Sequence, residues 1–263
     1  MKILIGLPIY KREWILPHWL RAIENQTIPL SEIGFLFELG PHDEATHDML
    51  WEWHSRHPEV AVFDGIIREH EVHKHHAEGQ RQWARHDYHR MVDFRNNLLE
   101  RAVGYQPERY FSLDSDILIP NPRTLEGLFQ ITAEPGTTAA PLCYMTPRNI
   151  DAPNVMTWID KPGGRARRLL DQYPIGTVFE VGISMAAVMM SPEVYNNVRY
   201  RWHFQGEDLG WSAEVLRLGY KMYSASNIYA PHIMQEGLLE FYLQNDDQRS
   251  TDLMSLQTCL PLV

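Results

Sequence analysis

The sequence contains few cysteines, no long apolar run and no excess of positive charge. Its 263 residues include 2 cysteines, which lie far apart and outside any CxxC spacing. This count argues against a disulfide framework and a thiolate zinc site, and it favours a reducing, cytoplasmic setting. No segment approaches the roughly 18 to 20 consecutive apolar residues of a membrane helix. The short apolar run that ends at Pro8 is typical of a buried strand rather than a signal peptide.

Acidic side chains outnumber basic ones by 34 to 24, so the formal net charge is −10. This excess argues against a nucleic-acid binder that works by charge alone, although a local basic face stays open. Because 44% of the residues are hydrophobic, the chain can bury a substantial core. There is no internal repeat and no Gly/Ser linker, so we expect one domain over residues 1–245 and a tail without periodicity at 246–263.

Strand and helix patterns alternate along the first part of the chain. Continuous apolar runs at 2–8 and 33–39 predict strands that are covered on both faces, and a third strand is expected at 60–63. Helical spacing of apolar residues lies between these runs, at 14–23 and 44–57. This order predicts parallel strands with crossover helices, so functional side chains are expected beyond the carboxyl ends of the strands.

From residue 88 onward the strands no longer follow a strict strand–helix order. We therefore expect a sheet that is mostly parallel and becomes mixed in its second half. Helical spacing marks four segments, at 88–104, 124–132, 193–198 and 209–218. Apolar runs predict strands at 109–113, 139–145 and within 179–190, followed by a strand pair near 220–223 and 228–230.

Two polar segments interrupt these patterns, at 65–90 and 146–175. The first holds His70, His73 and His76, whose spacing would stack them on a helix and permits a metal site. No acidic residue has the spacing from these histidines that known zinc-binding motifs require, so a solvated loop or helix is the favoured interpretation. The second segment is longer than most loops of compact domains, and loops of such length are usually functional or mobile.

Two carboxylates follow an apolar strand, at Asp114 and Asp116 on either side of Ser115. Because strand side chains alternate, both carboxylates face the same side. Buried acids at a strand end need a cation or a hydrogen-bond donor, and oxygen ligands of this kind suit Mg²⁺ or Mn²⁺. A solvated turn is the alternative, because the pattern is short and common.

Further candidate residues lie near the end of the sequence. Glu207 and Asp208 stand between Gly206 and an amphipathic stretch, where the positive end of a helix dipole would stabilise them. Capping of the first helical turn is the simpler interpretation of this pair. His232 follows the last apolar run, and a single histidine in such a place is more often structural than a ligand.

In combination, these segments resemble the GT-A class of nucleotide-sugar glycosyltransferases, in particular the inverting family-2-like enzymes. The resemblance spans roughly residues 2–235, and its pieces come in the family's order. They are the segment PIYKR after the first strand, an acid after the second, an Arg-Asn pair, the DxD, a Gly-containing strand, the Glu-Asp pair and a late His. The resemblance implies an α/β fold with one Rossmann-like GT-A domain, in which residues 1–120 bind the nucleotide and 121–245 the acceptor.

The resemblance also implies roles in binding the donor. Pro8 and Tyr10 would line the uridine pocket, and Glu38 would contact uracil or the ribose. The family's usual Asp-Asp-Gly-Ser turn is replaced here by Glu-Leu-Gly-Pro at residues 38–41, which leaves the identity of the base open. Asp64 would be a second nucleotide-binding acid. The remaining donor-binding positions are Arg95, Asp114, Ser115 and Gly182.

For catalysis, the resemblance implies that Asp116 and His232 hold Mn²⁺ or Mg²⁺ on the diphosphate of the donor. Asp208, next to Glu207, would be the general base that removes the proton of the acceptor hydroxyl. One base that acts in line, opposite the leaving group, gives inversion at the anomeric carbon.

Two other classes of function stay open. A sugar-nucleotide nucleotidyltransferase has a similar sheet, but this chain lacks a Gly-rich N-terminal loop with a following Arg and Lys. A catalytically inactive binding module would keep the fold without hydrolysing a donor. The acceptor is open as well: a glycan, a small molecule or a nucleic acid with a hydroxylated base. The basic segments 68–95 and 161–168 would suit an anionic acceptor.

Overall fold

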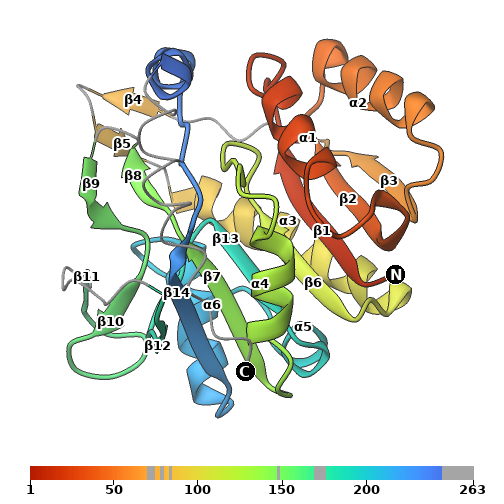
Figure 1. Cartoon of the computed structure of the whole chain (residues 1–263). Helices are drawn as coiled ribbons and strands as arrows, with labels where there is room; N and C mark the ends of the chain where they lie inside the picture. The colour runs from red at the N-terminus through yellow and green to blue at the C-terminus, as the bar shows by residue number, and fades with distance from the viewer. Residues whose placement is uncertain (70–74, 78–79, 83–84, 147–148, 169–175, 245–263) are drawn as a thin grey trace.

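The structure is a computed structural model of the chain and describes residues 1–69, 75–77, 80–82, 85–146, 149–168 and 176–244 (Figure 1). The helices are α1 (Leu16–Glu24), α2 (Glu44–Arg56), α3 (Arg85–Tyr105), α4 (Thr124–Ile131), α5 (Pro192–Asn197) and α6 (Glu207–Arg217), with a 3-10 helix at Leu30–Glu32. The main sheet contains β1 (Ile3–Ile9), β2 (Ile33–Leu39), β3 (Val62–Ile67), β6 (Arg109–Leu113), β7 (Thr137–Leu142), β12 (Val178–Glu180), β13 (Ala187–Met190) and β14 (Lys221–Tyr229). Three antiparallel pairs lie beside it: β4 (His75–Ala77) with β5 (Gln80–Gln82), β8 (Tyr144–Thr146) with β9 (Asn149–Pro153), and β10 (Met156–Trp158) with β11 (Ala166–Arg168).

The main sheet has the strand order β12-β14-β7-β13-β6-β1-β2-β3. Neighbouring strands from β3 through β2 and β1 to β6 are parallel, and so are β7 and β14. The exceptions are β13, antiparallel to β6 and β7, and β12, antiparallel to β14. The sheet is thus mostly parallel and mixed in its second half, which confirms the predicted α/β class.

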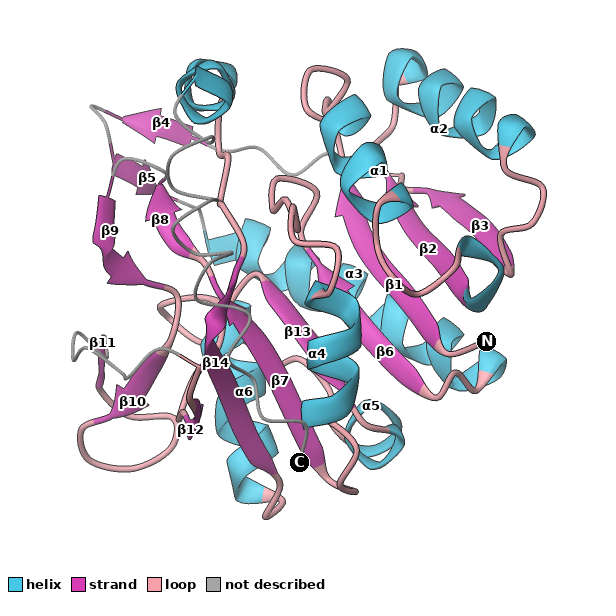
Figure 2. Cartoon of the chain, in the orientation of Figure 1, coloured by secondary structure: helices cyan, strands magenta, loops and turns pink. Residues whose placement is uncertain are grey.

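Helices cover the sheet on both faces, as Figure 2 shows. Along β1, Ile3, Ile5 and Leu7 belong to a core that they share with α1, α2 and α4. Leu4 belongs to a second core, with α3, α5 and α6. The split follows from the two-residue period of a strand, whose successive side chains point to opposite faces. Apolar side chains on both faces are the reason that the strand segments read as continuous apolar runs.

The register of the parallel strands brings their carboxyl ends to one edge of the sheet. Pro8 lies beside Glu38, and Gly6 lies beside Ser112. The chain therefore leaves β1, β2 and β6 at nearly the same level, and the segments that follow these strands meet there. In open sheets of this kind, ligands bind at that edge.

The structure corrects the strand pair that was expected within 220–230. Lys221–Tyr229 is one strand, which pairs in parallel with β7 and shifts its register near its end. Polar residues interrupt the apolar pattern there and suggest a break. One of them, Ser224, is buried and donates a hydrogen bond to the carbonyl oxygen of Ala140. A polar side chain with a backbone partner is therefore compatible with the strand interior.

Other segments differ from the expectation as well. The strand predicted at 139–145 ends at Leu142, and the chain then pairs with β9 in a separate ladder. Where it is described, the polar segment 146–175 forms β9, β10 and β11. His76 lies in a strand rather than on a helix, whereas His70 and His73 lie outside the described residues, as does the tail 246–263. Within the described part of the chain, no helix is long and apolar enough to cross a membrane.

Substitution of Gly6, in β1, tests how tightly the core near the carboxyl edge of the sheet is packed. A Cβ at this position would come within 2.1 Å of the hydroxyl oxygen of Tyr110, whose ring is buried. Because a buried ring has little room to move, we expect Gly6→Ala to lower the free energy of unfolding by about 1–3 kcal/mol. Urea unfolding followed by circular dichroism measures this change.

Gly104→Ala is the matched control. A Cβ at Gly104, which is exposed near the end of α3, would meet no atom within 4 Å. This variant should leave the stability unchanged or raise it by up to about 1 kcal/mol, because alanine favours a helix over glycine. Equal destabilisation by the two substitutions would contradict the packing explanation.

Candidate active site

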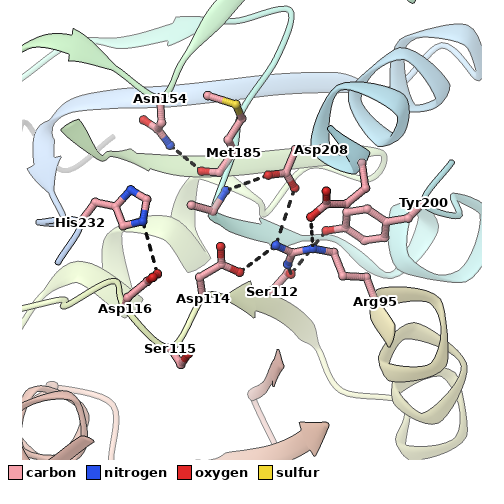
Figure 3. A network of polar contacts seen from close by, with 12 residues as sticks. Arg95, Ser112, Asp114, Ser115, Asp116, Asn154, Met185, Tyr200, Asp208 and His232 are labelled. Atoms are coloured by element: carbon pink, nitrogen blue, oxygen red, sulfur yellow. Dashed lines mark hydrogen bonds and ion pairs between the residues drawn. The ribbon is translucent and has the colours of Figure 1, made fainter. Parts of the chain in front are cut away.

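The loop after β6 carries Asp114 and Asp116, and backbone hydrogen bonds fix its course. The amide of Asp114 donates to the carbonyl oxygen of Ala186, just before β13, at 2.9 Å. The carbonyl oxygen of Asp116 accepts from the amide of Ile233 at 2.7 Å. Because Ile233 follows His232, this bond brings the imidazole to the carboxylate of Asp116, with Nε2 3.3 Å from Oδ1 (Figure 3).

The guanidinium of Arg95, on α3, lies at the centre of the site (Figure 3). It donates to the Ser112 hydroxyl at 3.0 Å, to Asp114 Oδ1 at 2.8 Å and to Glu207 Oε1 at 3.1 Å. Its Nη2 lies 4.0 Å from Asp208 Oδ1. Burial would lower the pKa of Arg95, but the surrounding carboxylates raise that pKa above its ordinary value. The guanidinium therefore stays charged although it is buried.

Asp208 is the second residue of α6, and its carboxylate points back toward the end of β6. Gly206, just before the helix, has a φ of 132°, a conformation that favours glycine. Asp208 Oδ2 accepts from the amide of Ala186 at 3.4 Å, which lies outside the helix. Burial raises the pKa of Asp208 to about 8, against the opposing charge of Arg95. Asp208 therefore binds a proton far more tightly than an ordinary aspartate does.

Asp116 is buried, and both of its carboxylate oxygens face basic side chains. Oδ1 faces His232, and Oδ2 lies 3.0 Å from Arg12 Nη2. A carboxylate oxygen and an imidazole nitrogen that lie 3.3 Å apart, as Asp116 Oδ1 and His232 Nε2 do, form a donor pair that could hold Mn²⁺ or Mg²⁺. No group of three or more His, Cys, Asp and Glu side chains that could hold a metal occurs among the described residues. Such an ion would take its other oxygens from substrate or water.

Sequence reasoning assigned no role to Ser112, Tyr200 or Arg12, which complete the site. Ser112 accepts from Arg95, and the alternation along β6 is the signal that places it on the face toward α3. The Tyr200 ring lies under the same guanidinium, 5.4 Å from ring centroid to Cζ. Arg12 lies in the loop after β1 and reaches Asp116 across 104 residues of sequence. A basic residue in a loop has no pattern that would predict such a partner.

At the ends of β1 and β2, the structure brings three predicted donor-binding residues together. The Tyr10 ring lies so close to Gly40 that a Cβ there would be 2.0 Å from Tyr10 Cδ2. Pro8 stands beside Glu38 in the register. The Glu38 carboxylate is buried and accepts a hydrogen bond from Asn97 on α3. Burial raises the pKa of Glu38 above its ordinary value.

Asp64 and Gly182 have other partners, and in the described part of the chain neither contacts the Arg95 side chain. Asp64 pairs with Arg101 Nη2 at 2.8 Å and accepts from the Tyr105 hydroxyl, both further along α3 than Arg95. A Cβ on Gly182 would stand 3.1 Å from the Trp158 ring, so glycine lets β10 approach closely. These contacts give both residues a structural role, and their part in donor binding stays a prediction.

The loop 199–206 presents two exposed aromatic side chains just before α6. Trp202 is 39% exposed and Phe204 is 62% exposed. The loop packs against the helix through Gly210, where a Cβ would lie 2.0 Å from the carbonyl oxygen of Arg201. Trp211, by contrast, is a core residue with no exposed surface. Trp202, whose ring also stacks on His89 with 5.8 Å between ring centroids, and Phe204 therefore offer aromatic surface to a ligand beside α6.

Solved structures resemble this architecture over most of the chain. The mannosyltransferase PcManGT from Pyrobaculum calidifontis, in complex with GDP-Man and Mn²⁺, matches 92% of this chain with a TM-score of 0.58 and 13% identity. GalNAc-T7, with UDP, GalNAc and Mn²⁺, matches 89% with a TM-score of 0.63 and 11% identity. TarS residues 1–349 from S. aureus, in complex with UDP-GlcNAc, match 88% with a TM-score of 0.54 and 13% identity. The chain has the GT-A fold.

The GT-A assignment rests on shape rather than on sequence. No family profile and no curated protein sequence matches the chain. The chain spans 60% of PcManGT, 44% of GalNAc-T7 and 57% of the TarS fragment. The GT-A fold implied by the order of the motifs is confirmed, and it places the Arg95 network at the carboxyl edge of the sheet.

The raised pKa of Asp208 predicts how stability depends on pH. The ordinary pKa is 3.8, and the folded protein raises it to about 8. Between these values the folded protein holds a proton that the unfolded chain has lost. Stability therefore falls as the pH rises through this window and levels off above it. Asp208→Asn should flatten the fall and raise the melting temperature near pH 8 by several degrees, at about 2–4 °C per kcal/mol.

Melting curves in EDTA, from about pH 5 to about pH 9, measure this dependence. Asp48→Asn, on the exposed side of α2, is the control and should melt in parallel with the wild type. If Asp208→Asn also ran parallel to the wild type, burial of an ionisable Asp208 would not be the cause.

Proposed function

We propose that this chain is a metal-dependent glycosyltransferase that moves a sugar from a nucleotide diphosphate sugar to an acceptor hydroxyl, with inversion. One observation carries the proposal: Arg95 joins Asp114 at the end of β6 to Asp208 at the start of α6, beside the Asp116–His232 pair. Groups suited to the donor, to a metal ion and to a base thus meet at one edge of a GT-A sheet. Nucleotide-sugar complexes among the structural neighbours support this class of substrate.

We assign nucleotide binding to residues 1–120 and the acceptor side to residues 121–245. Pro8 and Tyr10 would contact the base and ribose at the end of β1, with Glu38 behind them. Asp114, with Ser115, would contact the ribose and hold Arg95 in place. We propose UDP as the nucleotide, with GDP as the alternative, because the neighbours were solved with UDP, UDP-GlcNAc or GDP-Man.

Asp116 and His232 would hold Mn²⁺ or Mg²⁺ on the diphosphate. A carboxylate, an imidazole and phosphate oxygens form a donor set that suits Mn²⁺, and both PcManGT and GalNAc-T7 were solved with this ion. When bound, the ion supplies positive charge that stabilises the leaving diphosphate. The backbone hydrogen bond between the loop after β6 and the segment after β14 supports this role, because it keeps His232 beside Asp116.

Asp208 would accept the proton of the acceptor hydroxyl, with Glu207 holding Arg95 beside it. A raised pKa makes the ionised carboxylate a stronger base than an ordinary aspartate. Arg95 lies close enough to favour the ionised form, and further positive charge in the complete complex would favour it more. One such base opposite the leaving group supports inversion.

The alternatives are a sugar-nucleotide nucleotidyltransferase and an inactive binding module. Several carboxylates gathered around one buried arginine are costly to fold, and a binding module has no need of a strongly shifted Asp208. The cost of gathering these charges therefore favours an enzyme over a binding module. The nucleotidyltransferase differs in what it releases, since it forms the sugar nucleotide instead of breaking it.

Calorimetric titration with UDP, with and without Mn²⁺, tests the donor site. We expect binding that depends on Mn²⁺ and weakens at least about tenfold in Asp116→Asn, which lacks the charged ligand. Asp208→Asn should bind UDP and Mn²⁺ like the wild type but lose sugar transfer by about 10²–10⁴-fold, as expected for a general base. Titrations with GDP, CDP and dTDP identify the nucleotide base that the protein prefers.

The outcomes separate the three classes. If none of these nucleotides binds with Mn²⁺, the glycosyltransferase proposal is wrong. Donor binding without hydrolysis or transfer would favour the binding module. Release of pyrophosphate from a nucleoside triphosphate and a sugar phosphate would favour the nucleotidyltransferase.

We propose that the acceptor approaches over Trp202 and Phe204, whose loop leads directly into α6. Aromatic rings stack on the apolar faces of sugars and on nucleic-acid bases, so both acceptor classes fit. The loop between β10 and β11, which carries the exposed Arg165, reaches the same helix: a Cβ on Gly163 would lie 3.7 Å from that of Ala213. Arg165 pairs with Asp160 of the same loop, with Nε 3.1 Å from Oδ2, and Lys161 adds one further positive charge. This small positive excess beside aromatic rings suits an anionic acceptor.

Alanine substitutions at Trp202 and Phe204 test this surface. Each should raise the acceptor KM about tenfold, because a stacked ring contributes about 1–3 kcal/mol. The rate of donor hydrolysis without acceptor should not change. Trp51→Ala, on the exposed side of α2, is the control.

Oligosaccharides and DNA containing hydroxymethylated cytosine serve as acceptor probes. If DNA is the acceptor, its affinity should fall steeply with added salt, whereas a neutral glycan should show a flat response. An unchanged KM in both loop variants, for whichever probe is glycosylated, would contradict the proposed surface.

A further inference from the structure

Arg12 contacts the loop after β6 through two of its guanidinium nitrogens. Nη2 lies 3.0 Å from Asp116 Oδ2, and Nε donates to the Ser115 hydroxyl at 3.2 Å. The Arg12 side chain is 14% exposed and that of Asp116 only 5%. A buried carboxylate that ionises needs a partner of opposite charge, and Arg12 supplies one.

The backbone of Arg12 is fixed, so the side chain alone can change its partner. The Arg12 amide donates to Thr46 Oγ1 at 3.2 Å, which ties the loop to α2. The Arg12 carbonyl oxygen accepts from the amides of Ile15 and Leu16, at 3.0 and 2.8 Å, at the start of α1. The guanidinium thus extends from a rigid point into the edge of the sheet where the proposed diphosphate lies.

We propose that Arg12 neutralises Asp116 while the site is empty and transfers to the donor's diphosphate when a divalent ion binds Asp116. This inference rests on the proposed function. Arg12 would then oppose binding of the metal alone and favour binding of metal and donor together.

Charge balance explains the exchange. Arg95 is already engaged with Asp114 and Glu207, so it does not balance the charge of Asp116. Without Arg12, Asp116 would present its full charge to a cation. With Arg12 in place, an ion on the Asp116 carboxylate meets a like charge close by, which repels it.

The diphosphate removes this conflict. It adds negative charge next to the ion, and a guanidinium binds phosphate oxygens through paired hydrogen bonds. Arg12 can therefore exchange one anionic partner for another. Lysine would keep the charge but not the paired geometry, so Arg12→Lys should behave between the wild type and Arg12→Gln.

Binding of Mn²⁺ to the nucleotide-free protein, followed by the electron paramagnetic resonance signal of free Mn²⁺, tests the inference. Arg12→Gln should bind Mn²⁺ about tenfold more tightly than the wild type, because the repelling cation is gone. With saturating Mn²⁺, the same variant should bind UDP at least about tenfold more weakly, because a charged phosphate ligand is lost. Arg21→Gln, an exposed change on α1, controls for net charge and should change neither affinity.

The outcomes separate this inference from the proposed function. If Mn²⁺ affinity is unchanged or lower in Arg12→Gln while Asp116→Asn still weakens Mn²⁺-dependent UDP binding, Arg12 has no such role and the proposed function stands. If UDP binding is unchanged in Arg12→Gln, its transfer to the diphosphate is wrong. If no variant, including Arg12→Gln, binds Mn²⁺ or nucleotide, both proposals fail together. Melting curves and the Arg12→Lys variant exclude misfolding as the cause of any loss.

Discussion

The guanidinium of Arg95 holds three elements of the fold in one arrangement. It extends from α3, donates to Ser112 and Asp114 at the end of β6, and donates again to Glu207 at the start of α6. Hydrogen bonds to a charged donor are among the stronger ones in proteins, and here they are buried. One side chain therefore ties the start of α6, where Asp208 lies, to the end of β6.

This arrangement is costly for stability and useful for chemistry. Arg95 has more carboxylates around it than one cation can neutralise, and burial keeps the pKa of Asp208 high. A protein selected for stability alone would not gather these charges. A site that receives a positively charged ion with an anionic substrate, and later a proton, has use for each of them. The electrostatic conflict among these carboxylates therefore supports the enzymatic role that we propose.

Elements whose cause is local could be predicted from the sequence. The strand at 33–39 is an unbroken apolar run, and its observed bounds are the same. The family resemblance and the order of the motifs predicted that the DxD and the Glu-Asp pair lie in one site. The contacts that Arg95 makes with these motifs join residues far apart in the sequence, so no local pattern predicts them. The nucleotide-binding role of Asp64 stays a prediction, and its contacts with Arg101 and Tyr105, 37 and 41 positions later in the sequence, had no local signal. Single residues in loops, such as Arg12, carry no periodicity, so their partners follow only from the register of strands far apart in the chain.

Two arginines from the first half of the chain divide the acids of the site between them. Arg12, in the loop after β1, engages Asp116, whereas Arg95 engages Asp114 and the acids of α6. His232 comes from the far end of the sequence, through backbone bonds between the loop after β6 and the segment after β14. Neither half of the chain contains every group of the site, because Glu207 and Asp208 lie in the second half and Arg95, their cationic partner, lies in the first. The site therefore exists only when β1, β6 and β14 lie in one sheet and α3 and α6 pack beside it, because these elements position its groups.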